Sequence, residues 1–248
     1  MNMFFFRKTS SREDLAVLMC HFKDYPLITK KFADYWLFRE IMDLFNRKGH
    51  LTKEGLQQIV NLRASLNKGL SSPCDPADSN VVKQRGEGLK EAFPKTIPVS
   101  RPLVNDQVIK DPYWLAGFAT GEGCFSVGLY KSRLYKTGFQ VSIRFSISQH
   151  SCDSKLMESL INYLSCGNYM LHSCRETGEF IVTKFSSIED TIIPFFQKYP
   201  ILGVKALDFV NFCQVAYIMK VKGHLTKSGL EQIISLREKM NTKIPFKV

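Results

Sequence analysis

The amino-acid sequence predicts an α+β protein that consists of one complete C-terminal unit and the helical tail of a second, related unit. Two observations support this prediction. The first is an internal repeat whose two copies differ in length. The second is a change from helical to alternating apolar spacing and back again within residues 111–241, which is typical of strands placed between helices.

The internal repeat relates the two ends of the chain at one constant offset. Residues 25–38 (YPLITKKFADYWLF) align with residues 199–212 (YPILGVKALDFVNF), and residues 46–67 align with residues 220–241, both at an offset of 174. From position 25 to position 69, 18 of 45 residues are identical, where ordinary composition gives roughly three by chance. The chain therefore contains two related units, and nearly all of residues 111–180 has no counterpart in the first.

The complete unit is expected to run helix, two strands, helix, two strands and then helices. Its first helix begins at Asp111 and Pro112, since proline is favoured at the first helical position, and extends to Gly121. Apolar periodicity then predicts strands at 124–129 and 139–149, a helix around 156–164, strands at 168–173 and 180–185, and helices at 188–198, 205–221 and 226–241.

The chain divides into three parts by composition and repeat. Residues 1–70 are expected to form the truncated N-terminal unit, residues 71–110 a linker, and residues 111–248 the complete unit. Five of the ten prolines lie between positions 70 and 110, among Ser, Asp and Lys, which favours an extended linker.

The charge balance narrows the class of partner. Lys and Arg number 34 against 23 Asp and Glu, a net charge of +11, which favours nucleic acid or an acidic membrane surface. No run of 18 apolar residues occurs, so no membrane span is predicted. The seven cysteines include no CxxC pair, which argues against a disulfide framework or zinc ribbon. A cluster of His150, Cys152, Cys166, His172 and Cys174 could hold zinc, but a half-buried sheet explains it equally well.

A row of polar side chains follows one face of the strand expected at residues 139–149. Val141, Ile143, Phe145 and Ile147 alternate with Gln140, Ser142, Arg144, Ser146 and Ser148, as in a half-buried antiparallel strand. Such a face can simply be solvated. Its hydroxyl, amide and guanidinium groups are, however, those that reach base edges and phosphates, and a two-stranded ribbon fits a major groove. The preceding strand and its turn extend this candidate DNA-binding surface with Ser126, Tyr130, Ser132 and Arg133.

The stretch WLAGFATGEGCF, residues 114–125, places a lone carboxylate at the end of a helix. The last helical turn carries partial negative charge, so Glu122 is mildly destabilising there unless a positive charge lies beside it. Gly117 and Gly121 lie four residues apart on one helix face, with Ala116 beside them, and such small residues let two helix backbones approach closely. A tight helix contact inside a single core is the alternative explanation.

This motif resembles the LAGLIDADG sequence of homing endonucleases. Leu115, Ala116 and Gly117 match its opening, and Gly121, Glu122 and Gly123 match its acidic end. The segments GEGCF, FSISQH, VTKFSS and ILGVK resemble the C-terminal half of the single-chain, two-motif members found in fungal mitochondrial introns. Residues 9–70 resemble the tail of the N-terminal half of such a protein, so the resemblance covers nearly the whole chain.

The resemblance implies the LAGLIDADG αββαββα homing-endonuclease fold, in which the motif helices of two units pack together and each delivers one carboxylate. It implies site-specific cleavage of double-stranded DNA with Mg²⁺, and a mitochondrial location. Glu122 would bind the metal, with the carbonyl of Gly121 as a neighbouring ligand. Gln149 would order water in the active site. Lys205 and its repeat partner Lys31 would lie near the scissile phosphate, although a solvated cation at a helix start explains both lysines too. Lys184 of the VTKFSS segment joins the DNA-binding set.

The sequence departs from a two-motif enzyme because it supplies a single motif helix. Three explanations stay open: the product begins upstream, two chains pair through residues 112–121, or the gene is decaying; truncation or decay is favoured. The alternative functions are an RNA-splicing maturase, which would bind its own intron RNA, or a catalytically dead DNA-binding remnant.

Overall fold

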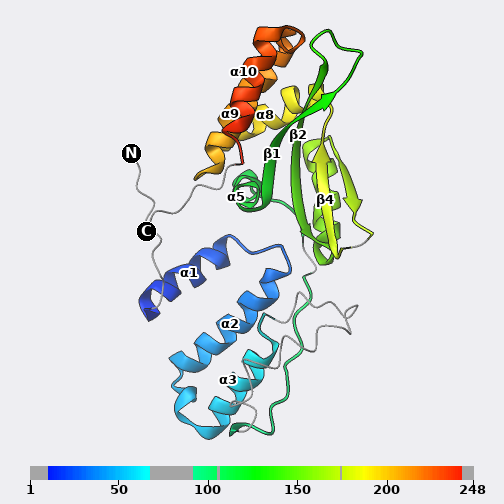
Figure 1. Ribbon diagram of the computed structural model, residues 1–248. Helices are drawn as coiled ribbons and strands as arrows, with labels where there is room; N and C mark the ends of the chain where they lie inside the picture. The colour runs from blue at the N-terminus through cyan, green and yellow to red at the C-terminus, as the bar shows by residue number, and fades with distance from the viewer. Residues whose placement is uncertain (1–10, 68–91, 105–106, 174, 242–248) are drawn as a thin grey trace. The chain divides into compact units, whose positions relative to one another are not determined.

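The computed structural model describes residues 11–67, 92–104, 107–173 and 175–241 (Figure 1). These residues form two compact units, which divide between Gln107 and Val108. Unit 1, before the division, is helical in its described residues, whereas unit 2, after it, combines helices with a four-stranded sheet. This composition confirms the predicted α+β class.

The sheet of unit 2 is antiparallel and has the strand order β1-β2-β4-β3. Its strands are β1 (Gly123–Lys131), β2 (Phe139–His150), β3 (Asn168–Leu171) and β4 (Thr177–Val182). In the register of β1 with β2, Gly123 pairs with Ile147 and Ser126 with Arg144. The predicted alternation along β2 is confirmed, because Val141, Ile143, Phe145 and Ile147 are all buried.

The helices of unit 2 cover the apolar face of this sheet. They are α6 (Ser154–Leu164), the continuous helical segment α7 (Phe185–Ser187), η3 (Ile188–Ile192) and α8 (Ile193–Lys198), then α9 (Lys205–Lys220) and α10 (Lys227–Glu238). Aromatic rings fill the space between, since Phe125 of β1 lies 5.1 Å from Phe145 and 5.3 Å from Phe212, measured between ring centroids. One face of the sheet is thus committed to the core, and the other is left for function.

The motif helix α5 (Pro112–Glu122) leads directly into β1. Its start follows the prediction: Pro112 is the first helical residue, and the Asp111 carboxylate accepts a hydrogen bond from the backbone N–H of Tyr113 at 2.8 Å. Its end depends on Gly123, where an added Cβ would lie 2.5 Å from the carbonyl oxygen of Ala119. Only glycine therefore permits the strand to leave the helix this closely.

Unit 1 contains α1 (Arg12–Asp24), α2 (Lys31–Asn46), η1 (Gly49–Leu51) and α3 (Lys53–Ser65). The offset of 174 maps α2 onto α9, η1 onto η4 (Gly223–Leu225) and the start of α3 onto that of α10. Lys48 and its counterpart Lys222 both adopt a left-handed backbone with φ of 58°. The internal repeat of the sequence is therefore also a repeat of structure, down to single turns.

The described part of the predicted linker packs along α3. The Ser65 hydroxyl donates to the carbonyl of Val99 at 2.6 Å, and the N–H of Ile97 donates to the side-chain oxygen of Asn61 at 3.1 Å. Arg101 forms an ion pair of 2.8 Å with Asp34 of α2. Residues 97–101 are thus tied to unit 1 by hydrogen bonds, although the composition predicts a simple extended linker.

Several element boundaries differ from the prediction by up to three residues. Strand β4 runs from Thr177 to Val182 rather than over 180–185, the following helical segment starts at Phe185 rather than at 188, and α10 ends at Glu238 rather than at 241. Thr177, Gly178 and Glu179 include poor strand formers, yet pairing with β2 and β3 holds them in the sheet, since tertiary context overrides strand propensity. As a result Glu179 belongs to the sheet surface. Among the described residues, none of the helices is long and apolar enough to cross a bilayer.

Candidate functional site

The candidate site centres on Glu122, the last residue of α5. Glu122 is exposed, and the strand that follows it starts at the buried Gly123. The helix therefore ends at the edge of the sheet, where β1 begins beside Ile147 of β2. This geometry leaves the carboxylate accessible to solvent at a helix end that already carries partial negative charge.

Lys205 supplies the positive charge that this helix end lacks. Its ammonium group donates hydrogen bonds to the carbonyl oxygens of Gly121 at 2.9 Å and Ala119 at 3.3 Å. Lys205 is the first residue of α9, so its side chain reaches from one helix start to the end of another. The Gly121 carbonyl at the helix end gains a donor in this way, while the Ala119 carbonyl also accepts from the N–H of Gly123. The cation stays close to Glu122.

A tether on α5 fixes the loop that precedes Lys205. The Thr120 hydroxyl accepts a hydrogen bond from the N–H of Leu202 at 3.2 Å and donates to the carbonyl of Ala116 at 2.8 Å. Burial lowers the pKa of Lys205 below its ordinary value of 10.5, and the neighbouring Cys124, Glu122 and Asp208 partly offset that shift. A partly desolvated ammonium next to a carboxylate is a suitable neighbour for an anionic substrate group.

Gln149 and Lys31, the other two predicted catalytic residues, lie in different surroundings. Gln149 lies on β2, two residues beyond the partner of Gly123, and its side-chain oxygen accepts from the N–H of His150 at 2.9 Å. Lys31 lies in unit 1, where its ammonium pairs with Asp34 at 3.2 Å. The described residues of unit 1 contain no counterpart of α5 for Lys31 to contact, so its catalytic role stays a prediction.

The predicted helix interface divides into buried and open positions. Ala116 is buried, at 3% exposure, whereas Gly117 and Gly121 are exposed. A Cβ added at either glycine would meet nothing within 4 Å. These two glycines form the open glycine face of α5, which has room for another helix, while Ala116 belongs to the core.

The polar sheet face carries an ion pair that the sequence analysis missed. The guanidinium of Arg144 on β2 donates to the carboxylate of Glu179 on β4, and the ring nitrogen Nε2 of His172 lies 3.9 Å from the other carboxylate oxygen. The proposed DNA-contacting guanidinium is therefore already paired in the structure. The early start of β4 explains why this acid went unnoticed.

The candidate DNA-binding residues differ in accessibility. Ser146 is only 4% exposed, so its hydroxyl is poorly accessible in this structure, and its contact with DNA stays a prediction. Gln140, Ser148, Arg133, Tyr130 and Lys184 are exposed, while Ser126, Ser132, Ser142 and Arg144 are intermediate. The Ser132 hydroxyl accepts from the N–H of Leu134 at 3.4 Å and so belongs to the turn between β1 and β2.

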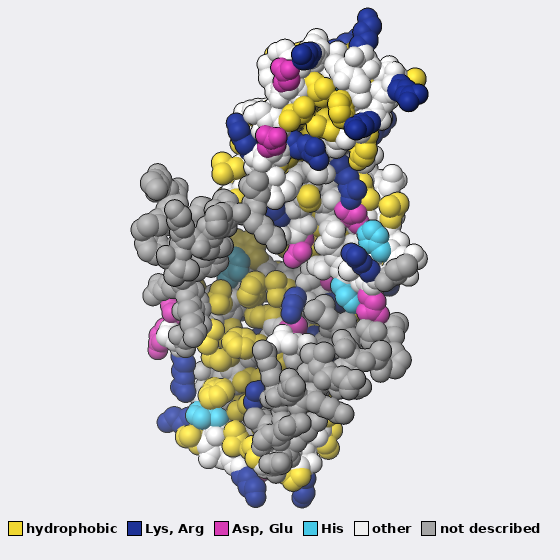
Figure 2. All heavy atoms as spheres, viewed as in Figure 1, with side chains coloured by type: hydrophobic (Ala, Val, Ile, Leu, Met, Phe, Trp, Pro, Cys, Tyr) yellow, Lys and Arg dark blue, Asp and Glu magenta, His cyan; other side chains and the backbone are white. Residues whose placement is uncertain are grey.

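The turn between β1 and β2 carries two further exposed cations that the prediction omitted, Lys131 and Lys136. With Arg133 they give the hairpin tip three positive charges. Lys and Arg side chains are also spread over the visible face of the rest of unit 2 (Figure 2). The signal for the missed lysines was present in the sequence, since both lie between the strands predicted at 124–129 and 139–149.

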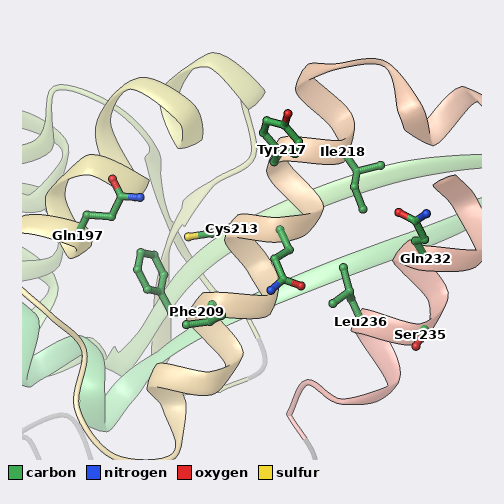
Figure 3. A pocket seen from close by; sticks show the side chains of 10 residues that line it. Gln197, Phe209, Cys213, Tyr217, Ile218, Gln232, Ser235 and Leu236 are labelled. Carbon is green, nitrogen blue, oxygen red and sulfur yellow. The ribbon is translucent and has the colours of Figure 1, made fainter.

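Two other kinds of site, a cluster of metal ligands and a pocket, were sought among the described residues. No group of three or more His, Cys, Asp or Glu side chains among the described residues is arranged to hold a metal ion. Cys174 of the possible zinc cluster lies outside the described residues. A hollow of about 750 Å³ lies between α8, α9 and α10 (Figure 3). It is lined by Phe209, Cys213, Tyr217 and Leu236 among others, and burial raises the pKa of the Cys213 thiol to about 11. Neither Glu122 nor Lys205 lines this hollow.

The fold and the site define an αββαββα protein whose motif helix delivers a carboxylate to the edge of a polar sheet. Known proteins share this arrangement. The family model described as LAGLIDADG endonuclease matches residues 115–216. A crystal structure of the I-SmaMI LAGLIDADG homing endonuclease bound to cleaved DNA matches with 44% identity and a TM-score of 0.83, over 93% of this chain and 72% of that one. A structure of I-SmaMI on uncleaved DNA in the presence of calcium ions matches with the same identity and TM-score, over 94% of this chain and 74% of that one.

The chain belongs to the LAGLIDADG homing endonuclease family. It is 39% identical over 224 residues to the protein named Probable intron-encoded endonuclease 3 of Neurospora crassa. That match covers 90% of this chain but 39% of the relative. The sequence thus spans less than half the length of this relative.

Proposed function

We propose that this protein is a site-specific endonuclease of double-stranded DNA that acts in intron homing and hydrolyses phosphodiesters with Mg²⁺. The observation that carries the proposal is the exposed Glu122 carboxylate at the end of α5, with Lys205 beside it and a polar sheet face next to it. The DNA-bound state of I-SmaMI, with 44% identity, supports it. The mitochondrial location implied by the family resemblance belongs to the same proposal.

The donor atoms at the site fit a hard cation such as Mg²⁺. Mg²⁺ prefers oxygen ligands, keeps several waters and is usually bound by one or two carboxylates together with substrate phosphates. The Glu122 carboxylate and the Gly121 carbonyl are such oxygen donors, and both lie at the end of α5. When bound, the ion would supply an activated water and stabilise the leaving oxygen of the phosphodiester.

Three further parts of the chain would contribute to the reaction: Lys205, Gln149 and the polar sheet face. Lys205 would hold the end of α5 in place through its hydrogen bonds to Gly121 and Ala119, and its positive charge would attract the scissile phosphate. Gln149, at the same edge of the sheet, would position water with its side-chain amide. The polar sheet face would bind the duplex and select its sequence through contacts to base edges.

A complete active site needs a second motif helix. The described residues contain one helix of this kind, α5, and unit 1 in its described part has only the helices that correspond to the end of unit 2. We propose that the open glycine face of α5 receives this second helix, from a further segment of the same product or from another copy of the chain.

The test of the proposed function is Glu122→Gln in an assay for nicking and cleavage of a plasmid that carries the exon junction flanking the coding intron. We expect cleavage to be lost while binding to the same duplex is kept or slightly strengthened, because one metal ligand and one negative charge near phosphate are removed. Glu231→Gln is the matched control, since Glu231 is an exposed carboxylate on α10. Equal loss of binding and cleavage in Glu122→Gln would contradict the proposal.

An RNA-splicing maturase or a catalytically dead remnant is the second candidate. The net charge of +11 and the polar sheet face suit binding of intron RNA as well as DNA, and RNA binding does not require two acids. Splicing of the host intron RNA, with and without the protein, separates the two candidates. A Glu122→Gln protein that still promotes splicing would support the maturase.

A further inference from the structure

The Arg144–Glu179 pair lies on the sheet surface that the proposed function assigns to DNA. The two residues are not direct partners in the sheet, because Arg144 of β2 pairs with Ser126 and Glu179 of β4 pairs with Ser148. The Arg144 and Glu179 side chains therefore lean toward each other along the sheet, over the four positions that separate Arg144 from Ser148. Ser146 lies between Arg144 and Ser148 along β2 and is only 4% exposed.

The two side chains differ in exposure. The Glu179 side chain is 12% exposed, whereas 41% of the Arg144 side chain is accessible. Because guanidinium carries five N–H donors in a rigid fork, the bond to the nearly buried Glu179 leaves other donors of Arg144 available. An arginine on a protein surface otherwise samples many conformations, and pairing with a carboxylate removes much of that freedom.

The carboxylate also changes what the guanidinium can bind. A free arginine on a basic surface contacts phosphate, which strengthens binding to every sequence alike. A nearby carboxylate repels phosphate, but it leaves unaffected the neutral acceptors O6 and N7 of guanine in the major groove, where arginine makes the commonest specific contact. The pair therefore lowers general affinity and raises discrimination between sequences.

We infer that Glu179 is a positioning residue for sequence recognition: it holds Arg144 along the sheet so that its guanidinium reads the major-groove edge of a guanine, and it prevents the arginine from contacting phosphate instead. His172, whose Nε2 lies 3.9 Å from the second carboxylate oxygen, occupies the other side of Glu179. The inference rests on the proposed DNA-binding function and adds a residue and a base class to it.

The experiment is a binding selection from a pool of randomised DNA duplexes in Ca²⁺, followed by measurement of affinity against salt for the selected duplex and for random duplex. The variants are Arg144→Ala, Glu179→Ala and Glu179→Gln, with Glu158→Ala as a control at an exposed position of α6. Thermal unfolding of each variant shows whether it is folded.

We expect the wild type to prefer guanine at one position and Arg144→Ala to lose this preference. Glu179→Ala should weaken it about tenfold while binding to random duplex stays equal or becomes tighter, and its salt dependence should steepen by about one phosphate contact. Glu179→Gln keeps an oxygen acceptor and should restore part of the preference. A purely structural role would instead weaken binding to all sequences without changing the preferred base.

Two outcomes overturn the inference separately from the proposed function. If the folded wild type binds no duplex, both fail. If the wild type binds DNA but Glu179→Ala keeps the same guanine preference as the wild type and the Glu158→Ala control, then only the role of Glu179 is wrong.

Discussion

The ammonium group of Lys205 lies 2.9 Å from the carbonyl oxygen of Gly121 and donates a hydrogen bond to it. The two residues are 84 positions apart in the chain, and this bond joins the start of α9 to the end of α5. The C-terminal end of α5 carries partial negative charge and ends in the acid Glu122, which is unfavourable. A nearby cation such as Lys205 stabilises this helix end. The same cation is placed where a phosphate would bind.

Lys205→Met should reduce cleavage strongly. The change removes the positive charge next to Glu122 and the hydrogen bond from Lys205 to the Gly121 carbonyl. We therefore expect loss of at least about 100-fold in the cleavage rate, the size typical of removing one electrostatic contact to a reacting group. Single-turnover cleavage at saturating protein measures this directly. Lys227→Met is the matched control, because Lys227 is likewise the first residue of a helix and is exposed. Equal rates in the two variants would contradict the assignment.

Asp34 in unit 1 should make stability depend on pH in acid. Burial alone would raise the pKa of Asp34, but hydrogen bonds from Arg101, the N–H of Asn67 and Lys31, with the charge of Arg101, lower it below the ordinary 3.8. A carboxyl whose pKa is lowered on folding stabilises the protein fully above its unfolded pKa and loses that contribution as the pH falls through the folded value.

Asp34→Asn should therefore destabilise the protein by about 1 to 3 kcal/mol at pH 7, and the difference from the wild type should shrink below pH 3.8. Urea unfolding followed by circular dichroism between pH 7 and pH 2.5 measures the difference. Asp24→Asn, at the exposed end of α1, is the control. A difference that stays constant down to the lowest pH would show that the charge of Asp34 is not the cause.

The helices of the repeat could be predicted closely because their signals are local. Thr52 and Thr226 each cap a helix by accepting from the N–H three residues later, and the apolar spacing between the caps is helical in both copies. The motif helix α5 was also predictable, since Asp111, Pro112 and Gly123 mark its two ends with residues whose preferences are set by backbone geometry.

The contacts that complete the site depend on residues far apart in sequence and could not be predicted in this way. Glu179 lies 35 positions from Arg144, on a strand whose first residues have low strand propensity and are held there by their neighbours. The family resemblance placed Lys205 near the site, but its bond to Gly121 depends on where the fold places the start of α9 relative to the end of α5. The burial of Ser146 is likewise a tertiary property that a pattern of alternating residues does not contain.

The open glycine face of α5 should tolerate a large side chain in the isolated chain but not in the active assembly. Nothing lies within 4 Å of a Cβ at Gly117, and leucine is a better helix former than glycine by up to about 1 kcal/mol. Gly117→Leu should therefore leave thermal stability equal or slightly higher. Close approach of a second motif helix, in contrast, requires small residues at this position.

We expect Gly117→Leu to weaken association with a second motif helix at least about tenfold, or 1.4 kcal/mol, and to abolish cleavage. Sedimentation with and without Mg²⁺ and the exon-junction duplex measures the mass of the complex, and nicking is followed in the same samples. Lys155→Leu, at an exposed position of α6, controls for the added apolar surface. If Gly117→Leu forms the same complexes and cuts as well as the wild type, the glycine face is not where the second carboxylate enters. If Gly117→Leu is folded and stable but neither associates nor cuts, while Lys155→Leu does both, the result supports packing of the second motif helix on this glycine face.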